Sequence, residues 1–310
     1  LLAPAGQDPR RNPCSHGPTM TTANSGTPRA YILSFQCPDR LGVVANYSQL
    51  FLQVGAFITE ISNYSDPVTA TFHLRCVFDD RAMTVSFEEF SDRFAELATE
   101  MNMRYRLRPA DQLPRVLLAV SRYDHCLVAL LTKWRSGALP AEIVGVVSNH
   151  EDCRSQVEWH GLPYHYLPVT AETKPQQEAQ ILDLIREQQV DLLVLARYMQ
   201  ILSDDLCREL EGRAINIHHS FLPGFKGAKP YHQAYDRGVK VIGATAHYVT
   251  SDLDEGPIIA QEVKAIDHQV SVEQMIHLGH DTEATALSHA VRLHCEERVQ
   301  LNGQRTVILW

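Results

Sequence analysis

The residues best suited to chemistry lie in the segment 215–227 and in the turn 251–257. Asn216 and His218 stand two positions apart in a run predicted to be a strand, so both side chains project from one face. The turn contributes Asp254 within a group of carboxylates. An amide that stabilises an oxyanion, with an imidazole and a carboxylate that move protons and orient water, suffices for attack on a carbonyl carbon. We therefore predict these three residues to be catalytic.

The same histidines and carboxylates have alternative interpretations. His218 could be an ordinary hydrogen-bonded residue of a strand, and Asp252 and Glu255 could be solvated turn residues. His218, His219 and His247 together could also suggest a metal site, but no zinc spacing such as HExxH occurs, so no metal is predicted. No serine or cysteine stands in a nucleophile elbow such as GxSxG, which favours direct addition of water or an amine over a covalent intermediate.

The chain that must position these residues is predicted to be α/β. Short, fully apolar runs such as VLLAV and DLLVLA are typical of a parallel sheet covered on both faces. They alternate with helical patterns from residue 115 to 310, which predicts a Rossmann-like domain with a mostly parallel sheet. In such a sheet ligands bind outside the carboxyl ends of the strands, where Asn216 and His218 lie. Strands are predicted at 115–121, 143–148, 164–168, 190–196, 214–218, 239–248 and 305–309, and a long helix at 272–299.

A smaller pattern precedes this domain, at residues 29–108. It predicts a strand, a helix over 41–54 with Asp39 as its N-cap, a hairpin, a second helix and a last strand. The order βαββαβ is the ferredoxin-like arrangement. Residues 109–114 are predicted to be a linker. Residues 1–28 are rich in small and polar residues and contain the first methionine, Met20, so we expect a disordered leader of upstream or added sequence.

Composition excludes several classes of protein. Hydrophobic residues make up 45% and charged residues 21% of the 310 residues, which are ordinary globular values. The net charge of −9 and the lack of a basic patch argue against a nucleic-acid partner. No apolar run approaches the roughly 18 to 20 residues of a membrane span. The seven scattered cysteines form no CxxC pair, which favours reduced thiols and a cytoplasmic location.

Two motifs resemble those of a known family. NIHHSFLPGFKGAKPYHQA at 216–234, followed by HYVTSDLDEGPIIAQE at 247–262, closely resembles the folate-dependent formyltransferase family. The resemblance matches Asn216, His218 and Asp254 to the family's catalytic residues, and LARYMQILSDD at 195–205 to its pterin-binding loop. It implies that folate is bound by Met199, Gln200, Ile201, Leu202, Lys226 and Gly256.

The first domain resembles an ACT regulatory domain through CPDRLGVVANYSQLF at 37–51. This resemblance implies an amino-acid effector, glycine or methionine, held by Asp39, Arg40, Leu41, Gly42 and Asn46. The alternative is that the domain only assembles subunits, and in either case we expect a homo-oligomer.

An ACT domain fused to a formyltransferase-like domain implies the hydrolytic branch of the family. That branch converts 10-formyltetrahydrofolate and water to formate and tetrahydrofolate, for one-carbon balance and purine biosynthesis, with folate as substrate and no cofactor. Transferase relatives carry a glycine-rich phosphate-binding loop after the first strand. Here residues 121–126 are bulky and contain no glycine, which favours water as acceptor. The alternatives are a formyltransferase to an amine, or a catalytically silent sensor of amino acid or folate.

The implied mechanism is direct attack of water on the formyl carbon. We expect partial burial to raise the pKa of Asp254, which then orients or deprotonates water. Asn216 and protonated His218 would stabilise the oxyanion. Whether His218 or Asp254 is the formal base stays open.

Overall fold

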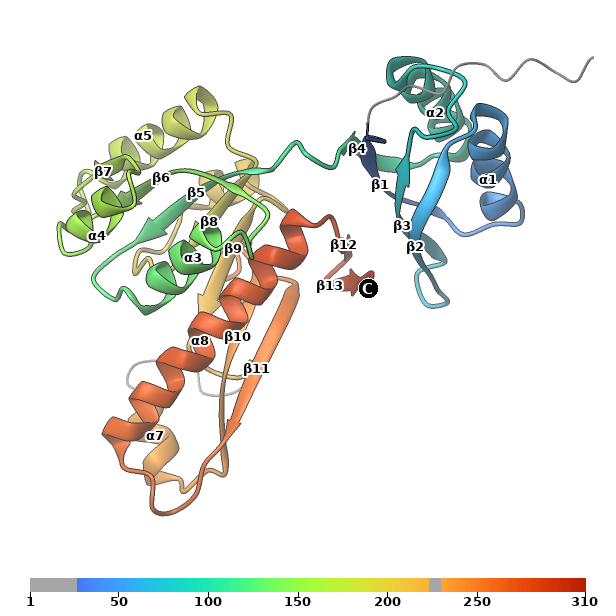
Figure 1. The fold of residues 1–310 in the computed structure, drawn as a ribbon. Coiled ribbons are helices and arrows are strands. Elements are labelled where there is room, and N and C mark those ends of the chain that lie inside the picture. Colours follow the sequence, from blue (N-terminus) through green and yellow to red (C-terminus); the bar gives the residue numbers. More distant parts are fainter. Residues whose placement is uncertain (1–26, 223–229) are drawn as a thin grey trace, which may run out of the picture.

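The computed structural model describes residues 27–222 and 230–310. Two units follow one another along the chain (Figure 1). The N-terminal unit contains a four-stranded sheet with two helices, and the C-terminal unit contains a seven-stranded sheet with helices on both faces. Nearly all of the predicted leader lies outside the described residues.

The N-terminal unit is a fully antiparallel sheet in the order β2-β3-β1-β4. One face of the sheet packs on the helices through a core rich in aromatic side chains, among them Phe35, Phe51 and Phe90. The βαββαβ order predicted from the sequence is therefore present. Its elements are β1 (Ala30–Pro38), α1 (Val43–Val54), β2 (Phe57–Asp66), β3 (Thr71–Asp79), α2 (Phe87–Met101) and β4 (Arg104–Pro109).

Helix α1 starts later than predicted, and the predicted cap is wrong. Gly42 is the N-cap, with a φ of 96° that glycine adopts at no steric cost. Asp39 lies before this turn, where its backbone N–H donates to the carbonyl of Ala70 at 2.7 Å. The chain thus reverses direction at Gly42, which leaves Asp39 too far back to cap the helix.

The C-terminal unit has the sheet order β11-β10-β9-β8-β5-β6-β7. The strands from β5 to β9 pair in parallel, whereas β10 and β11 pair antiparallel, so the predicted fold class is confirmed. The elements are β5 (Arg115–Val120), α3 (His125–Arg135), β6 (Glu142–Ser148), α4 (Arg154–Trp159), β7 (Tyr164–Tyr166), α5 (Lys174–Glu187), β8 (Leu192–Leu195), α6 (Asp204–Glu209), β9 (Ala214–His218), α7 (Pro230–Asp236), β10 (Val241–Tyr248), β11 (Ile258–Ala265) and α8 (Val272–Cys295).

The central strands are buried on both faces, as their apolar runs predicted. Leu118 of β5 and Val194 of β8 pack in one core that includes residues of α3 and α8. Leu117 and Leu193, the neighbours of those residues, pack in a second core with α5 and α6. Alternate side chains of one strand thus enter opposite layers. Helix α8 runs along β10 and β11 (Figure 1).

The end of the chain differs from the prediction. Helix α8 ends at Cys295, and Glu297 adopts a φ of 56° that turns the chain out of the helix. A hairpin follows, made of β12 (Val299–Asn302) and β13 (Arg305–Ile308). The helix was predicted to continue to 299, and β12 was not predicted, whereas the strand predicted at 305–309 corresponds to β13.

The β12–β13 hairpin joins the two units. His73 Nδ1 lies 2.8 Å from Gln300 Oε1, and the amide of Gln300 donates to the carbonyl of Leu74 at 2.9 Å. The amide of Asn302 donates to Asp66 at 2.6 Å. These buried polar groups satisfy one another only when the units meet in this arrangement. None of the helices within the two described ranges is long and apolar enough to cross a membrane.

Candidate active site

Asn216, His218 and Asp254 come together at the carboxyl end of β9. Asn216 and His218 lie in the last three residues of this strand, and Asp254 lies in the turn between β10 and β11. Because β10 runs antiparallel to β9, it ends opposite Ile215 near the start of that strand, and the turn that follows must fold back for Asp254 to reach His218. The Nδ1 of His218 is 3.2 Å from Oδ2 of Asp254.

The imidazole of His218 has one nitrogen held and one available. Its Nδ1 is bound by Asp254, whereas its Nε2 is buried with no hydrogen-bond partner within the described chain. His218 also lines a cavity of about 300 Å³. An unsatisfied buried nitrogen is costly, so this atom is best explained as a group reserved for a reactant.

The expected raised pKa of Asp254 is wrong. The hydrogen bond from His218 lowers the pKa of Asp254, and this effect outweighs burial, which acts in the opposite direction. A carboxyl group with a lowered pKa is ionised at neutral pH and is a weak base. Asp254 is therefore suited to orienting His218 rather than to removing a proton from water. Its φ of 58° shows that the turn holds this residue in the left-handed region.

His247 is a site residue whose role the sequence analysis missed. Its Nδ1 lies 2.9 Å from the carbonyl of Tyr248, which places the ring hydrogen on Nδ1. Burial lowers the pKa of His247, so its Nε2 carries a lone pair at neutral pH. That nitrogen is 3.4 Å from the side-chain nitrogen of Asn216 and can hold the amide in one orientation. The role of His247 depends on the pairing of β9 with β10, which sets His247 opposite Asn216. This pairing joins strands distant in the chain, so spacing in the sequence did not reveal it.

A buried carboxylate, Glu283 of α8, lies behind the site. Glu283 is fully buried, accepts a hydrogen bond from the hydroxyl of Tyr231 at 2.8 Å and lies 2.9 Å from Nε2 of His125. The Nε of Arg197 is 3.3 Å from its Oε2. Burial alone would raise the pKa of Glu283, but the His125 hydrogen bond and the Arg197 charge more than offset it, so the pKa is lowered.

Arg197 connects Glu283 to the pair of histidines at 218 and 219. Its Nη1 lies 3.3 Å from Nδ1 of His219, and the rings of His219 and His218 stack at 4.7 Å. Burial lowers the pKa of His219 to about 4, so this ring is neutral at pH 7 and its Nδ1 can accept from Arg197. The chain from Glu283 through Arg197 to His219 thus supports one side of His218. No sequence motif predicts this chain of contacts, because Glu283 reaches the site only through the packing of α8.

His125, Cys126 and Glu283 have ligand atoms close enough together to hold a metal ion. The Arg197 cation and the Tyr231 hydroxyl already occupy the oxygens of Glu283. A positively charged neighbour opposes a second cation by direct repulsion. The contacts of this cluster are therefore those of an ion pair with the protein's own arginine.

Comparison with known proteins decides the family. Residues 114–291 match the model of the formyl transferase family. A formyltetrahydrofolate deformylase of Corynebacterium sp. (strain P-1) is 48% identical over 279 residues, covering 90% of this chain and 98% of its own. This chain belongs to the formyltetrahydrofolate deformylase family. The deformylase of Bacillus subtilis is 42% identical and covers 89% of this chain and 92% of its own.

Comparison with solved structures supports the same family assignment. A formyltetrahydrofolate deformylase from Burkholderia mallei has a TM-score of 0.88 and 46% identity, covering 91% of this chain and all of its own. A glycinamide ribonucleotide transformylase from Symbiobacterium toebii has a TM-score of 0.61 and 29% identity, and covers only 64% of this chain. The deformylase matches nearly the whole chain, whereas the transformylase matches about the length of one unit.

In this deformylase-family chain the predicted pterin-binding loop lines the same cavity as Asn216, His218 and Asp254. Met199, Gln200, Ile201 and Leu202 follow β8 and face that cavity. The backbone N–H of Met199 donates a hydrogen bond to Oγ of Ser121 at 2.9 Å, which fixes the start of this loop. Met199 and Ile201 are exposed apolar side chains, as a surface that binds an aromatic ring requires. The predicted Lys226 lies outside the described residues.

Gly256 does not line the cavity but determines how the Asp254 turn packs. A Cβ at Gly256 would lie 1.8 Å from the carbonyl oxygen of Tyr248, which is too close for any side chain. Gly256→Ala is expected to displace the turn and lower kcat roughly tenfold, because small misplacements of catalytic groups are costly. Steady-state kinetics on folded protein, verified by its thermal midpoint, would test this. A normal kcat would contradict the packing argument.

Glu283→Gln is expected to lower the free energy of unfolding by about 2 kcal/mol, because it leaves the Arg197 charge poorly compensated in a buried position. Glu273→Gln on the same helix is the matched control, since Glu273 is exposed. Urea unfolding of both variants gives the comparison. Equal midpoints in the two variants would show that the ion pair contributes nothing.

Of the residues predicted to bind an amino acid, those at 39–42 lie between β1 and α1, and Asn46 lies in the first turn of α1. Arg40 donates to the carbonyl of Glu100 at 3.0 Å, and the amide of Asn46 lies 3.4 Å from the sulfur of Met101. Leu41 is fully exposed. Asn46 borders a groove between α1 and α2, but Asp39, Arg40, Leu41 and Gly42 do not line it. Their regulatory role stays a prediction.

Proposed function

We propose that this chain hydrolyses 10-formyltetrahydrofolate to formate and tetrahydrofolate with Asn216, His218 and Asp254. One observation carries the proposal most strongly. The ionised Asp254 holds Nδ1 of His218, while Nε2 of the same ring is buried, unpartnered in the described chain and part of the cavity wall. This is the arrangement of a base that a carboxylate keeps in one tautomer.

The first step forms a bond between the water oxygen and the formyl carbon. Nε2 of His218 accepts the proton that the water loses, and the Asp254 carboxylate stabilises the imidazolium that results. The carbonyl oxygen takes up the electron pair of its π bond and becomes an oxyanion. The amide of Asn216, held by His247, donates a hydrogen bond to this oxygen.

The second step breaks the bond between the formyl carbon and the folate nitrogen. The oxyanion reforms the carbonyl group, and Nε2 of His218 returns its proton to the departing nitrogen. The carbonyl product is formic acid, which releases its proton to solvent at neutral pH. One water is consumed and the products are formate, one proton and tetrahydrofolate, so the reaction balances with no cofactor. Residues 199–202 would bind the pterin ring beside these groups, with Lys226 near the anionic tail of folate.

Water is favoured over a phosphate-bearing acceptor. In a helix start the free backbone N–H groups attract anions. Here His125, the first residue of α3, contacts the buried carboxylate of Glu283, and the neighbouring Tyr123 stacks under Arg197. Bulky side chains and the Arg197–Glu283 ion pair thus stand at this helix start, where a transferase would carry a glycine-rich loop for a phosphate.

The loss of 10-formyltetrahydrofolate with water as the only acceptor tests the proposal. We expect equimolar release of formate and tetrahydrofolate without any added amine. Turnover that requires an amine would instead identify a transferase. Tight folate binding with no turnover at all would identify a sensor.

The proposal extends to the regulation and the cellular location of the protein. We propose a cytoplasmic homo-oligomer that serves one-carbon and purine metabolism and responds to glycine or methionine. The six cysteines in the described ranges are free, buried thiols, as a reducing compartment favours. Rates measured with each amino acid, and sedimentation of the full chain, test these points. Rates that neither amino acid changes would leave the N-terminal unit an assembly role only.

A further inference from the structure

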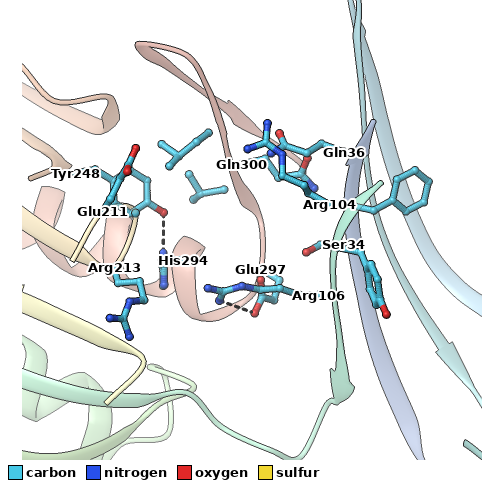
Figure 2. Close-up of a pocket in the computed structure, with 15 residues that line it drawn as sticks. Ser34, Gln36, Arg104, Arg106, Glu211, Arg213, Tyr248, His294, Glu297 and Gln300 are labelled. Carbon is cyan, nitrogen blue, oxygen red and sulfur yellow. Dashed lines mark hydrogen bonds and ion pairs between the residues drawn. The ribbon is translucent and has the colours of Figure 1, made fainter. Parts of the chain in front are cut away.

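A second cavity, of about 340 Å³, lies between the two units (Figure 2). It shares no lining residue with the cavity that contains His218. One wall is the face of the N-terminal sheet turned away from α1 and α2. The other wall belongs to the C-terminal unit and comes from the segment before β9, the end of β10, the end of α8 and the strand β12. The polar side chains of the two walls are Ser34, Gln36, Arg104, Arg106, Glu211, Arg213, Tyr248, His294, Glu297 and Gln300.

A row of arginines on β4 faces the C-terminal unit. Arg104, Arg106 and Arg108 alternate along the strand, so their side chains leave the same face of the sheet. Arg108 donates to the carbonyl of Cys295 at 2.8 Å, and its Nε is 3.5 Å from Oε1 of Glu297. The Nη1 of Arg106 is 3.5 Å from the same oxygen (Figure 2). One carboxylate therefore serves two arginines.

The remaining arginines of the cavity have no carboxylate partner in the part of the chain that the structure describes. Arg213 donates only to the backbone carbonyl of Glu209, at 3.1 Å. Arg104 has neither an ion pair nor a side-chain hydrogen bond there. His294 is largely buried, and burial together with the charge of Arg106 lowers its pKa to about 3, which leaves it neutral at pH 7. The walls thus carry three arginines against two glutamates, an excess of one positive charge.

We propose that this cavity binds a small carboxylate-bearing molecule through its arginines, above all Arg104. A guanidinium presents parallel N–H groups that match a carboxylate. The described chain supplies no carboxylate to Arg104 or Arg213, and of these two Arg104 also lacks any side-chain hydrogen bond there. Glu211, on the opposite wall, also has no ion pair in the described ranges and can accept an ammonium group. The volume lies at the lower end of the range of small-molecule sites. This location differs from the amino-acid site predicted from the sequence, at residues 39–42 and Asn46.

Tyr248 connects this cavity to the catalytic turn. Its hydroxyl lies 2.7 Å from Nδ1 of His294 at the cavity wall (Figure 2). Its backbone N–H donates to the carbonyl of Pro257 at 2.9 Å, and its carbonyl binds His247. Tyr248 therefore contacts both the end of the turn that contains Asp254 and the histidine that orients Asn216. A ligand that shifts Tyr248 is expected to change kcat by about fivefold or more, a typical allosteric coupling.

Calorimetric titration of the full chain, without folate, tests the binding site. The probes are glycine, methionine, glutamate and formate, with glycinamide as the control that lacks a carboxylate. We expect at least one carboxylate to bind, glycinamide not to bind, and Arg104→Ala to weaken binding about tenfold or more, as for loss of a charged hydrogen bond. Arg135→Ala, at an exposed arginine ending α3, is expected to leave binding unchanged. Binding of amino acids alone would support a zwitterion that also uses Glu211, and binding of formate would show that a carboxylate suffices.

Three results would overturn the site: no binding by any of the four carboxylates, equal affinity in Arg104→Ala, or a loss of binding in Arg40→Ala with none in Arg104→Ala. The last result would show that the ligand binds at the predicted site, at residues 39–42 and Asn46.

The link to catalysis rests on the proposed hydrolysis and needs a second measurement. Tyr248→Phe keeps the ring but removes the hydroxyl that meets His294. We expect this variant to bind the ligand while the effect of the ligand on kcat falls below twofold. An undiminished effect on kcat would show that Tyr248 does not transmit it. Because binding is measured without substrate, failure of the hydrolysis proposal would leave the binding result interpretable.

Discussion

Replacing His218 with alanine is expected to lower kcat about a thousandfold, within the range of general acid–base contributions. The variant loses the only group in the proposed mechanism that both takes a proton from water and returns one to the folate nitrogen. The affinity for 10-formyltetrahydrofolate is expected to change much less, because the pterin loop 199–202 remains. Single-turnover kinetics, with folate binding measured separately, distinguish the two effects.

His268→Ala is the matched control for this experiment. His268 is exposed between β11 and α8, so its loss removes an imidazole without touching the site. A kcat within about tenfold of the unmodified enzyme for His218→Ala would exclude this residue as the proton carrier. In that case Asp254 would have to act as the base despite its lowered pKa.

Asp254→Asn is expected to reduce kcat by about three orders of magnitude, with little change in size or shape. An amide offers His218 both an acceptor and a donor, so it no longer enforces the tautomer that leaves Nε2 free for water. It also removes the charge that stabilises the imidazolium. The measurement is kcat across pH 5 to 9, where the unmodified site keeps Asp254 ionised. Nearly full activity in the variant would show that Asp254 has no role in orienting His218.

The lowered pKa of Asp254 also predicts a dependence of stability on pH. The pKa is lower in the folded protein than in the unfolded chain, where it is about 3.9. The stabilisation is therefore present above the unfolded value and is lost as pH falls through the folded value. The difference in urea midpoint between the unmodified protein and Asp254→Asn should accordingly be larger at pH 7 than at pH 3. An equal difference at both pH values would contradict the ion pair.

Sequence patterns predicted much of the fold, because the burial of each strand and helix depends on the spacing of apolar residues within that element. Apolar runs such as Val116–Val120 identify strands buried on both faces, since each alternate side chain enters a core. The β9 strand was predicted with its observed bounds for the same reason. The strand predicted at 305–309 corresponds to β13, but β12 was missed, because its contacts with His73 and Asp66 lie far away in the chain.

The catalytic candidates could be named from sequence because Asn216 and His218 are two residues apart and Asp254 follows in a turn of a recognisable motif. The state of these groups could not. Burial alone predicted a raised pKa for Asp254, whereas the observed hydrogen bond to His218 lowers it. The sign of the shift depends on which atom faces the carboxylate, and spacing in the chain does not contain that information.

The sequence by itself determined the α/β class, the βαββαβ start and the residue types available for attack on a formyl group, because these follow from short-range periodicity and from adjacent side chains. Tertiary structure decided the roles of His247, Arg197 and Glu283, the position of the Asp254 turn, and the charged cavity between the units. All of these depend on contacts between elements far apart in the chain. Such contacts arise only when β10, α8 and the last hairpin pack around β9.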